Sequence, residues 1–278
     1  MNILKAILFG IVQGITEWLP VSSTGHMILL NEFIQMDVTP QFWQIFLVVI
    51  QLGSIIAVVI LFWDIIFPFD FSRRARKGGK VIRTQTFCLW GYVLIACIPA
   101  AVIGLAFDDV LDELFYHWYV VAVALIVFGV LFIVIENMNR HRKARVRDLS
   151  KLTWKDAVII GLFQVLAAVF PGTSRSGATI VGGLLIGIKR KVAAEFTFVL
   201  AIPVMFGASL LKVVKYGFSF SGEEVVILLV GMVTAFIVSL IVIRALMQFI
   251  RTHSFKIFGW YRIILGIAVL LYFGVFAT

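Results

Sequence analysis

The chain has 278 residues, of which 62% are hydrophobic and only 14% are charged, and its mean hydropathy is +1.06. A soluble domain is typically about half apolar and about a quarter charged, so this composition excludes an ordinary soluble globular protein. The net charge of +9 does not indicate nucleic acid as a partner, because the basic residues lie in short clusters between long apolar segments, as in loops that face anionic lipid.

The first apolar segment, residues 3–31, is interrupted near its middle by polar and helix-breaking residues. Pro20 is followed at once by Val21, two serines, a threonine and a glycine. A helix needs about 20 apolar residues to cross a bilayer, so neither arm of this segment crosses alone. We predict a re-entrant helical hairpin, whose elbow must be buried in protein or line a polar cavity because lipid cannot satisfy its backbone.

Six further segments are long and apolar enough to span the bilayer, and a second interrupted segment lies between the third and the fourth of them. The predicted spans are residues 42–63, 86–107, 118–136, 193–214, 224–247 and 257–277. The second interrupted segment is residues 154–188, with Pro171 and Gly172 at its centre. We predict that it is also a re-entrant hairpin.

The charged residues between the spans orient the protein. Basic clusters lie in the loops 64–85 and 137–153, at 189–191, and around the ends of the last two spans. Acidic residues are concentrated in the intervening connections: Asp108, Asp109, Asp112, Glu113, Glu223 and Glu224. The positive-inside rule places all the basic clusters in the cytoplasm, and both termini then lie on the outer face.

The two interrupted segments resemble each other. At a constant offset, Gly10, Gln13, Pro20 and Ser23 recur as glycine, glutamine, proline and serine: Gly161, Gln164, Pro171 and Ser174. Each half of the chain then contains one hairpin and three spans, and an odd number of spans inverts the second half relative to the first. Such inverted halves place their discontinuous helices together near the membrane midplane, with the binding site at their interface.

The sequence therefore predicts an all-α polytopic membrane protein with six transmembrane helices and two re-entrant helical hairpins in an inverted-topology repeat. The whole chain, 1–278, forms a single membrane domain, in which 1–150 is the first repeat and 151–278 is the second.

The first elbow carries the residues suited to catalysis. Ser23 and His26 are three residues apart and share a helical face, as a nucleophile and a base, or as a base and a phosphate ligand. Glu17 is a candidate to orient His26, to carry a proton, or to bind a divalent cation together with a phosphorylated substrate. Ionisable residues at membrane depth are costly and are functional by default. Ser22 and Thr24 complete the polar elbow as candidate substrate ligands.

The second elbow, PGTSRSGAT, has the pattern of an anion-binding site. Its hydroxyl residues are Thr173, Ser174, Ser176 and Thr179. Pro171 and Gly172 end one helical arm, and the free amides at the start of the next arm favour a bound anion. Arg175 adds a planar guanidinium that matches phosphate oxygens. The alternative is ordinary helix capping, with Arg175 extended to the membrane interface.

Three polar residues lie inside apolar segments. Gln13 and Gln51 are candidates either to bind substrate or to join helices by hydrogen bonds. Arg262, in the first turns of the last span, is expected to face the cytoplasmic interface.

The two motifs identify a family. QGITEWLPVSSTGHMILL and PGTSRSGAT resemble the two signatures of the bacterial undecaprenyl-diphosphate phosphatases, the bacitracin-resistance family. The resemblance extends to IQLGSIIAVV, AAEFTFVLAIP and FGWYRIILG, so it covers nearly the whole chain.

This resemblance implies hydrolysis of undecaprenyl pyrophosphate to undecaprenyl phosphate and phosphate, which recycles the carrier lipid of peptidoglycan synthesis. It implies catalytic roles for Glu17, Ser23, His26 and Arg175, with Ser174, Ser176 and Thr179 beside the arginine. Gln13 stands where the family has an acid or an amide, so it is expected to bind rather than to titrate. The family also implies Mg²⁺ or Ca²⁺ as cofactor, a bacterial inner-membrane location, and a site open to the periplasm. A homodimer is a further candidate assembly.

Three other functions fit the sequence less well. A transporter or flippase of a phosphorylated polyprenyl lipid would explain the inverted repeat and Arg175, but not the combination of Glu17, Ser23 and His26. The other large class of membrane lipid phosphatases has a Pro-Ser-Gly-His element, but no histidine follows Arg175 here at a useful spacing. A channel is disfavoured because no span has a polar stripe.

Overall fold

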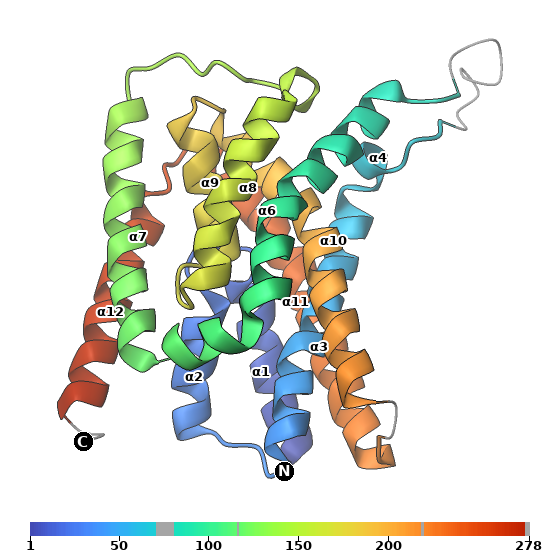
Figure 1. Ribbon diagram of the computed structural model, residues 1–278, viewed down its shortest axis with the longest axis vertical. Helices are drawn as coiled ribbons and strands as arrows, with labels where there is room; N and C mark the ends of the chain where they lie inside the picture. The colour runs from blue at the N-terminus through green and yellow to red at the C-terminus, as the bar shows by residue number, and fades with distance from the viewer. Residues whose placement is uncertain (71–80, 116, 218–219, 276–278) are drawn as a thin grey trace.

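A computed structural model describes residues 1–70, 81–115, 117–217 and 220–275, with the side chains of 108–109 and 112–113 left out. Its regular structure is helical, with two isolated β-bridges (Figure 1). The helices of the first half are α1 Asn2–Thr16, α2 Ser23–Phe33, α3 Pro40–Leu61, α4 Trp63–Ile66, α6 Thr84–Phe115 and α7 Trp118–Asn139. Those of the second half are the 3₁₀ turn η1 Leu149–Lys151, then α8 Trp154–Val169, α9 Arg175–Leu185, α10 Arg190–Tyr216, α11 Gly222–Phe249 and α12 Lys256–Val275.

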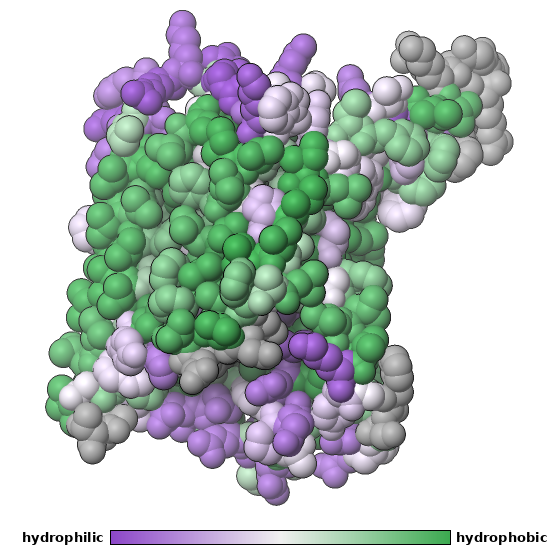
Figure 2. Space-filling model, viewed as in Figure 1, coloured by the Kyte–Doolittle hydropathy of each residue, from purple (hydrophilic) through white to green (hydrophobic). Residues whose placement is uncertain are grey.

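The six predicted spans correspond to α3, α6, α7, α10, α11 and α12, each long and apolar enough to cross a membrane. Figure 2 shows a broad hydrophobic belt between two hydrophilic ends, as expected for a protein with lipid as its lateral solvent. The second predicted span ends at the same residue as the apolar part of α6, Thr84–Phe107, and beyond it α6 continues as a helix to Phe115. The acidic residues Asp108, Asp109, Asp112 and Glu113 therefore belong to the end of this helix rather than to a loop, and their side chains lie outside the described residues.

Both chain termini lie at one end of the bundle, and the loop that joins α7 to α8 lies at the other (Figure 1). This arrangement agrees with the expectation that the termini share one face of the membrane, opposite the basic loop 137–153. Most of the basic residues predicted for the loop 64–85 lie outside the described residues: Arg73, Arg74, Arg76, Lys77 and Lys80.

The two interrupted segments form pairs of short helices, α1 with α2 and α8 with α9. The two pairs enter from opposite ends of the bundle, and their elbows meet near mid-height (Figure 1). Each elbow comprises a connection, residues 17–22 or 170–174, together with the first turn of the short helix that follows it. Thr153 and Asp156 form a capping box that starts α8, and Ser221 and Glu224 form another that starts α11.

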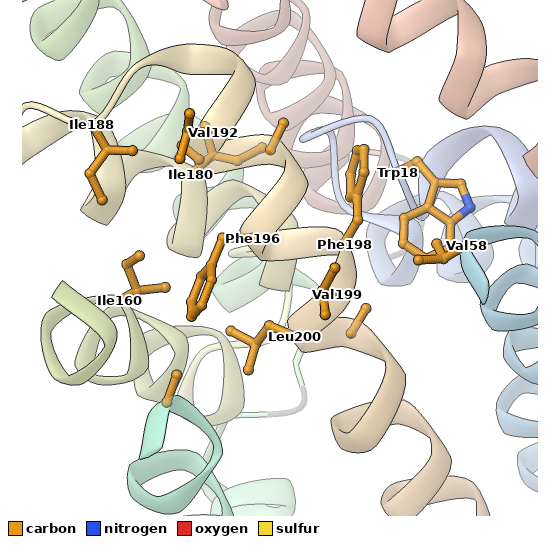
Figure 3. Close-up of a cluster of buried hydrophobic side chains, with 14 of the residues drawn as sticks. Trp18, Val58, Ile160, Ile180, Ile188, Val192, Phe196, Phe198, Val199 and Leu200 are labelled. Atoms are coloured by element: carbon orange, nitrogen blue, oxygen red, sulfur yellow. The ribbon is translucent and has the colours of Figure 1, made fainter. Parts of the chain in front are cut away.

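The largest apolar cluster includes Trp18 of the first elbow and many residues of α10. Trp18, in the first elbow, is fully buried and packs edge-to-face on Phe198 of α10, with ring centroids 5.2 Å apart (Figure 3). Val58 of α3 and Phe196 of α10 belong to the same cluster. The first elbow is therefore anchored to the second half of the chain by a large buried side chain.

Helices α7 and α12 cross at two glycines. A Cβ atom on Gly129 would lie 2.7 Å from the carbonyl oxygen of Gly259, and a Cβ atom on Gly259 would lie 2.7 Å from that of Gly129. Close helix contacts through small residues are the usual means of association in membranes. The reciprocal contact fixes α12, and the residues that it carries, against α7.

We predict that Gly129→Ala destabilises the protein by about 1–3 kcal/mol, because the added methyl group must separate two packed backbones. Gly91→Ala in α6 is the matched control, since a Cβ atom there meets nothing within 4 Å, and loss of a helical glycine should stabilise by about 0.5–1 kcal/mol. Thermal unfolding in detergent measures both. Equal melting temperatures for the two variants would contradict the close contact.

Candidate active site at the two elbows

The two elbows touch through an ion pair between their most polar residues. The Nη2 atom of Arg175 donates to Oε1 of Glu17 at 2.9 Å, and both side chains are nearly buried. The hydroxyl of Ser176 also donates to the carbonyl oxygen of Glu17 at 3.3 Å. The prediction that the elbows meet is therefore confirmed.

Glu17 is the centre of this cluster. While Oε1 accepts from Arg175, Oε2 accepts from Nε2 of Gln13 at 2.8 Å and from the hydroxyl of Ser23 at 3.0 Å. Gln13 is buried and Ser23 is partly exposed. Gln13 thus orients the carboxylate of Glu17. This carboxylate in turn accepts from the partly exposed hydroxyl of Ser23.

The serine that precedes each of the short helices α2 and α9 has a backbone conformation in the left-handed region. Ser22 precedes α2 with φ 73°, and Ser174 precedes α9 with φ 70°. Each hydroxyl accepts the amide of the glycine three residues later, Gly25 or Gly177, at 3.3 and 3.2 Å. Such backbone is uncommon outside glycine and is typical of functional turns. The first amides of both helices have no intrahelical acceptor and remain suited to an anion.

Most hydroxyls of the second elbow bond to the protein itself. Thr179 donates to the carbonyl oxygen of Arg175 at 2.9 Å and accepts from Thr197 of α10 at 2.9 Å. Ser176 and Thr173 are buried. Of the four hydroxyl residues predicted to bind substrate here, only Ser174 is partly exposed. Ser176 and Thr179 bond within the protein, whereas the buried hydroxyl of Thr173 has no hydrogen-bond partner among the described residues.

Arg175 is held inside the protein rather than extended to the interface. Its Nη1 donates to the carbonyl oxygen of Thr197 at 3.3 Å, and its guanidinium lies 6.0 Å from the ring centroid of Trp18. About 13% of the side chain is exposed. The guanidinium is therefore fixed on three sides.

His26 does not contact Ser23 or Glu17, so the predicted serine–histidine pair is not formed and Glu17 does not orient the ring. Its Nδ1 lies 2.7 Å from the carbonyl oxygen of Ser22, and its Nε2 lies 2.6 Å from the hydroxyl of Tyr261. Because a carbonyl only accepts, Nδ1 carries the proton, and a neutral ring then accepts from Tyr261 at Nε2. The geometric reason is that Ser23 turns back toward Glu17.

Two predicted ligands stand apart from this network. Thr24 follows Ser23 at the start of α2 and is partly exposed. Gln51 lies in α3, partly buried, and no hydrogen bond among the described residues joins it to either elbow. Two residues of α12 take positions that the sequence does not predict. Tyr261 bonds to His26, and Arg262 is completely buried rather than at the cytoplasmic interface. The only sequence signal for Arg262 was a lone arginine in an apolar span.

The side chains at the elbows are too few to hold a divalent cation by themselves. They fit a cation that is bound jointly by the protein and the substrate phosphates. No cluster of three or more histidine, cysteine, aspartate or glutamate side chains suited to a metal occurs among the described residues. Glu17 supplies the one carboxylate at the elbows. Magnesium is commonly held by one or two carboxylates together with substrate phosphates, which this donor set allows.

A cavity of about 650 Å³ lies away from the elbows, between the start of α6, η1 and the start of α10. Asp64, Asp148, Lys191 and Glu195 are among its lining residues. Hydrogen bonds from the side chain and then the amide of Ser150 hold the pKa of the exposed Asp148 carboxyl below its usual value. No elbow residue lines this cavity. The candidate site is therefore identified by the functional groups of the elbows and not by the position of the cavity.

Comparison with known proteins covers nearly the whole chain. The family model described as "Bacitracin resistance protein BacA" matches residues 6–268. A protein of Desulfitobacterium hafniense named undecaprenyl-diphosphatase is 60% identical over 273 residues, which cover 98% of this chain and 96% of that protein. Undecaprenyl-diphosphatase 1 of Clostridium acetobutylicum is 57% identical, with 98% of each chain covered. An undecaprenyl-diphosphatase of Enterococcus faecalis is 54% identical over 271 residues.

We predict strong coupling between Glu17 and Arg175 in a double-mutant cycle. Glu17→Gln or Arg175→Gln alone leaves a buried charge without its partner and should cost about 3–5 kcal/mol. The double variant removes both charges and should be clearly more stable than the sum of the single effects implies. Thermal unfolding of the four proteins tests this, and purely additive losses would contradict the ion pair.

Proposed function

Because the family model and the relatives cover nearly its entire length, this chain belongs to the bacitracin resistance protein BacA family, and we propose that the joined elbows are its catalytic site. The protein is an undecaprenyl-diphosphatase, which converts undecaprenyl pyrophosphate to undecaprenyl phosphate and phosphate. It is a bacterial multi-pass membrane enzyme. The observation that carries the site assignment is the Glu17 carboxylate, which binds Ser23 on one side and Arg175 of the other elbow on the other.

Ser23 is the proposed nucleophile. Its hydroxyl already donates to Glu17 at 3.0 Å, which is within reach for general-base catalysis. The Ser23 oxygen attacks the terminal phosphorus while its proton passes to Glu17. The bond from that phosphorus to the bridging oxygen breaks, and undecaprenyl phosphate leaves with the bridging oxygen. Water then hydrolyses the phosphoserine to release phosphate and restore Ser23.

Arg175 and the helix starts supply the charge stabilisation. Phosphoryl transfer depends mainly on positioning and on neutralising the charge of the transferred group. The carbonyl oxygen of Thr197 accepts from Nη1 of Arg175, and this contact can keep the guanidinium in place when pyrophosphate replaces Glu17 beside it. The first amides of α2 and α9 have no acceptor within their own helices, and they lie at these elbows, where they would add to the stabilisation of phosphate charge.

A divalent cation, Mg²⁺ or Ca²⁺, is proposed as cofactor, bound by Glu17 with the pyrophosphate. It would neutralise phosphate charge. Gln13 and Ser23 are the neighbouring oxygen-bearing side chains that would complete its surroundings.

We also propose that the paired short helices are re-entrant hairpins of an inverted repeat. The order of short pair followed by long helices recurs in the two halves. Helix α1 packs on α11, and α8 packs on α6, which are equivalent pairs under such a repeat. The reciprocal contact of Gly129 and Gly259 is the arrangement expected beside a two-fold axis between α7 and α12.

The site is proposed to open to the outer face, since the charge pattern places the termini and the first hairpin's entry there. In a variant with Cys88 and Cys97 replaced by serine, Glu32→Cys should react with a membrane-impermeant maleimide in intact cells. Lys143→Cys, in the basic loop, should react only after permeabilisation. The reverse pattern would place the first hairpin on the cytoplasmic side.

The first test of the function is phosphate release from undecaprenyl pyrophosphate by purified protein, with and without Mg²⁺ or Ca²⁺. Arg175→Ala should lower kcat/KM at least about 100-fold, and Ser23→Ala at least about 1,000-fold because the nucleophile is lost. Arg142→Ala, at an exposed loop arginine, is the matched control and should retain activity.

Different failures of this test have different meanings. Cation-independent release would remove the metal proposal alone. Substantial activity of Ser23→Ala would make water, rather than Ser23, the attacking group. Folded wild-type protein that binds the lipid without hydrolysing it would contradict the enzyme function and favour the flippase.

A further inference from the structure

Arg262 of α12 occupies an unusual position for an arginine in a membrane protein. Its side chain is completely buried, with 0% exposure. It lies between both elbows and α7, whereas a lone arginine near the start of a span would ordinarily extend toward the interface. A charge is costly to bury, so the structure around it must make specific use of its donors.

The guanidinium donates to backbone carbonyl oxygens of three separate segments. In the first elbow, Nη1 lies 3.3 Å from the oxygen of Pro20. In the second elbow, Nη2 lies 3.0 Å from the oxygen of Gly172 and 2.8 Å from that of Thr173. Longer contacts of 3.4 Å reach the oxygens of Ala124 and Leu125 in α7.

No carboxylate is among these acceptors in the described part of the chain. Three of the acceptors, in the elbows, are carbonyls that become free where Pro20 and Pro171–Gly172 interrupt the helices. Inside a membrane, such carbonyls have neither water nor a following helical turn to satisfy them. Arg262 thus satisfies the backbone of both breaks with one side chain.

The neighbouring residues are shaped to admit it. A Cβ atom on Gly177, in the first turn of α9, would lie 3.0 Å from Nη1 of Arg262. The guanidinium also lies 5.7 Å from the ring centroid of Phe128. The second elbow therefore packs directly on the guanidinium as well as bonding to it.

We propose that Arg262 is a positioning residue for the diphosphatase reaction: it fixes the elbow that carries Glu17 and Ser23 relative to the elbow that carries Arg175. This inference rests on the proposed catalytic site. Arg262 itself does not bind substrate, because it is buried and its described hydrogen bonds all go to backbone oxygens. Its effect on the rate comes from the alignment of the base, the nucleophile and the phosphate-binding arginine, for which an error of 1 Å can cost about 100-fold.

The planar guanidinium of Arg262 is essential for holding the two elbows in position. An arginine presents five donors in a fixed plane and can bond to several segments at once. A lysine keeps the charge but presents three donors from a single nitrogen, so it cannot bridge both elbows and α7 with the same geometry. Arg262→Lys therefore separates alignment from charge.

The kinetic test compares wild type with Arg262→Lys and Arg262→Met. Both variants should lower kcat about 100-fold and change KM by less than about threefold. Arg244→Met, at an exposed arginine of the spanning helix α11, is the matched control and should leave both constants unchanged. Wild-type kcat in Arg262→Lys would overturn the proposal, as would a raised KM with unchanged kcat, which would indicate a direct substrate contact.

A second measurement follows the elbows without reference to activity. The hydroxyl of Ser176 lies 3.5 Å from the carbonyl oxygen of Leu19, so Leu19→Cys with Ser176→Cys reports the contact between elbows. In membranes of a variant without Cys88 and Cys97, oxidation should join this pair several-fold faster with Arg262 present than with Arg262→Lys. Equal rates would overturn the positioning role even if the wild-type protein proved not to be a phosphatase, and unequal rates would support it.

Discussion

The constraint on which the structure depends is that lipid cannot hydrogen-bond to a broken helix. Pro20 and Pro171 interrupt two helices at membrane depth, and the carbonyls and amides released there must be satisfied by protein. The chain does so by bringing the two breaks together. Ser22 and Ser174 cap the following helices, and Arg262 binds the carbonyls of both elbows. The same breaks that would destabilise the fold create the polar cluster in which we propose that pyrophosphate binds.

Charge balance within this cluster explains why catalytic groups can persist in an apolar interior. Glu17 and Arg175 neutralise each other across the elbows, and Gln13 and Thr197 complete their hydrogen bonds. An isolated ion at this depth would be far more costly than a paired one. In the proposed mechanism, substrate binding would exchange partners rather than create a new buried charge, because pyrophosphate would pair with Arg175 and Glu17 would hold the divalent cation.

The sequence predicted the spans and the meeting of the elbows because both follow from composition: about 20 apolar residues make a span, and polar residues beside proline in an apolar segment need burial. It could not predict how hydroxyls are used. Ser22 and Ser174 serve as caps and Thr179 bonds to its own helix, since the helix takes its nearest acceptors first. Nor could it assign Arg262, because a lone arginine in an apolar span can extend to the interface or turn inward, and only the positions of the elbow carbonyls decide between them.

The proposed repeat pairs different residues according to whether the two halves are aligned by their sequences or by their helix caps. The sequence pairs Ser23 with Ser174, but the caps pair Ser22 with Ser174. One more residue separates the proline from the capping serine in the second elbow, so Ser23 corresponds to Arg175. The first position of each short helix thus holds the proposed nucleophile, Ser23, in one half and the proposed phosphate-binding residue, Arg175, in the other. Before the elbow, Glu17 corresponds to Ala168, and Gln164, which corresponds to Gln13, is buried with no partner for its amide among the described residues. The two halves therefore offer different groups at equivalent positions. In the proposed site, Glu17 and Ser23 of the first half supply the base and the nucleophile, while Arg175 of the second half binds the phosphate, and this asymmetry lets one site both attract the substrate and attack it.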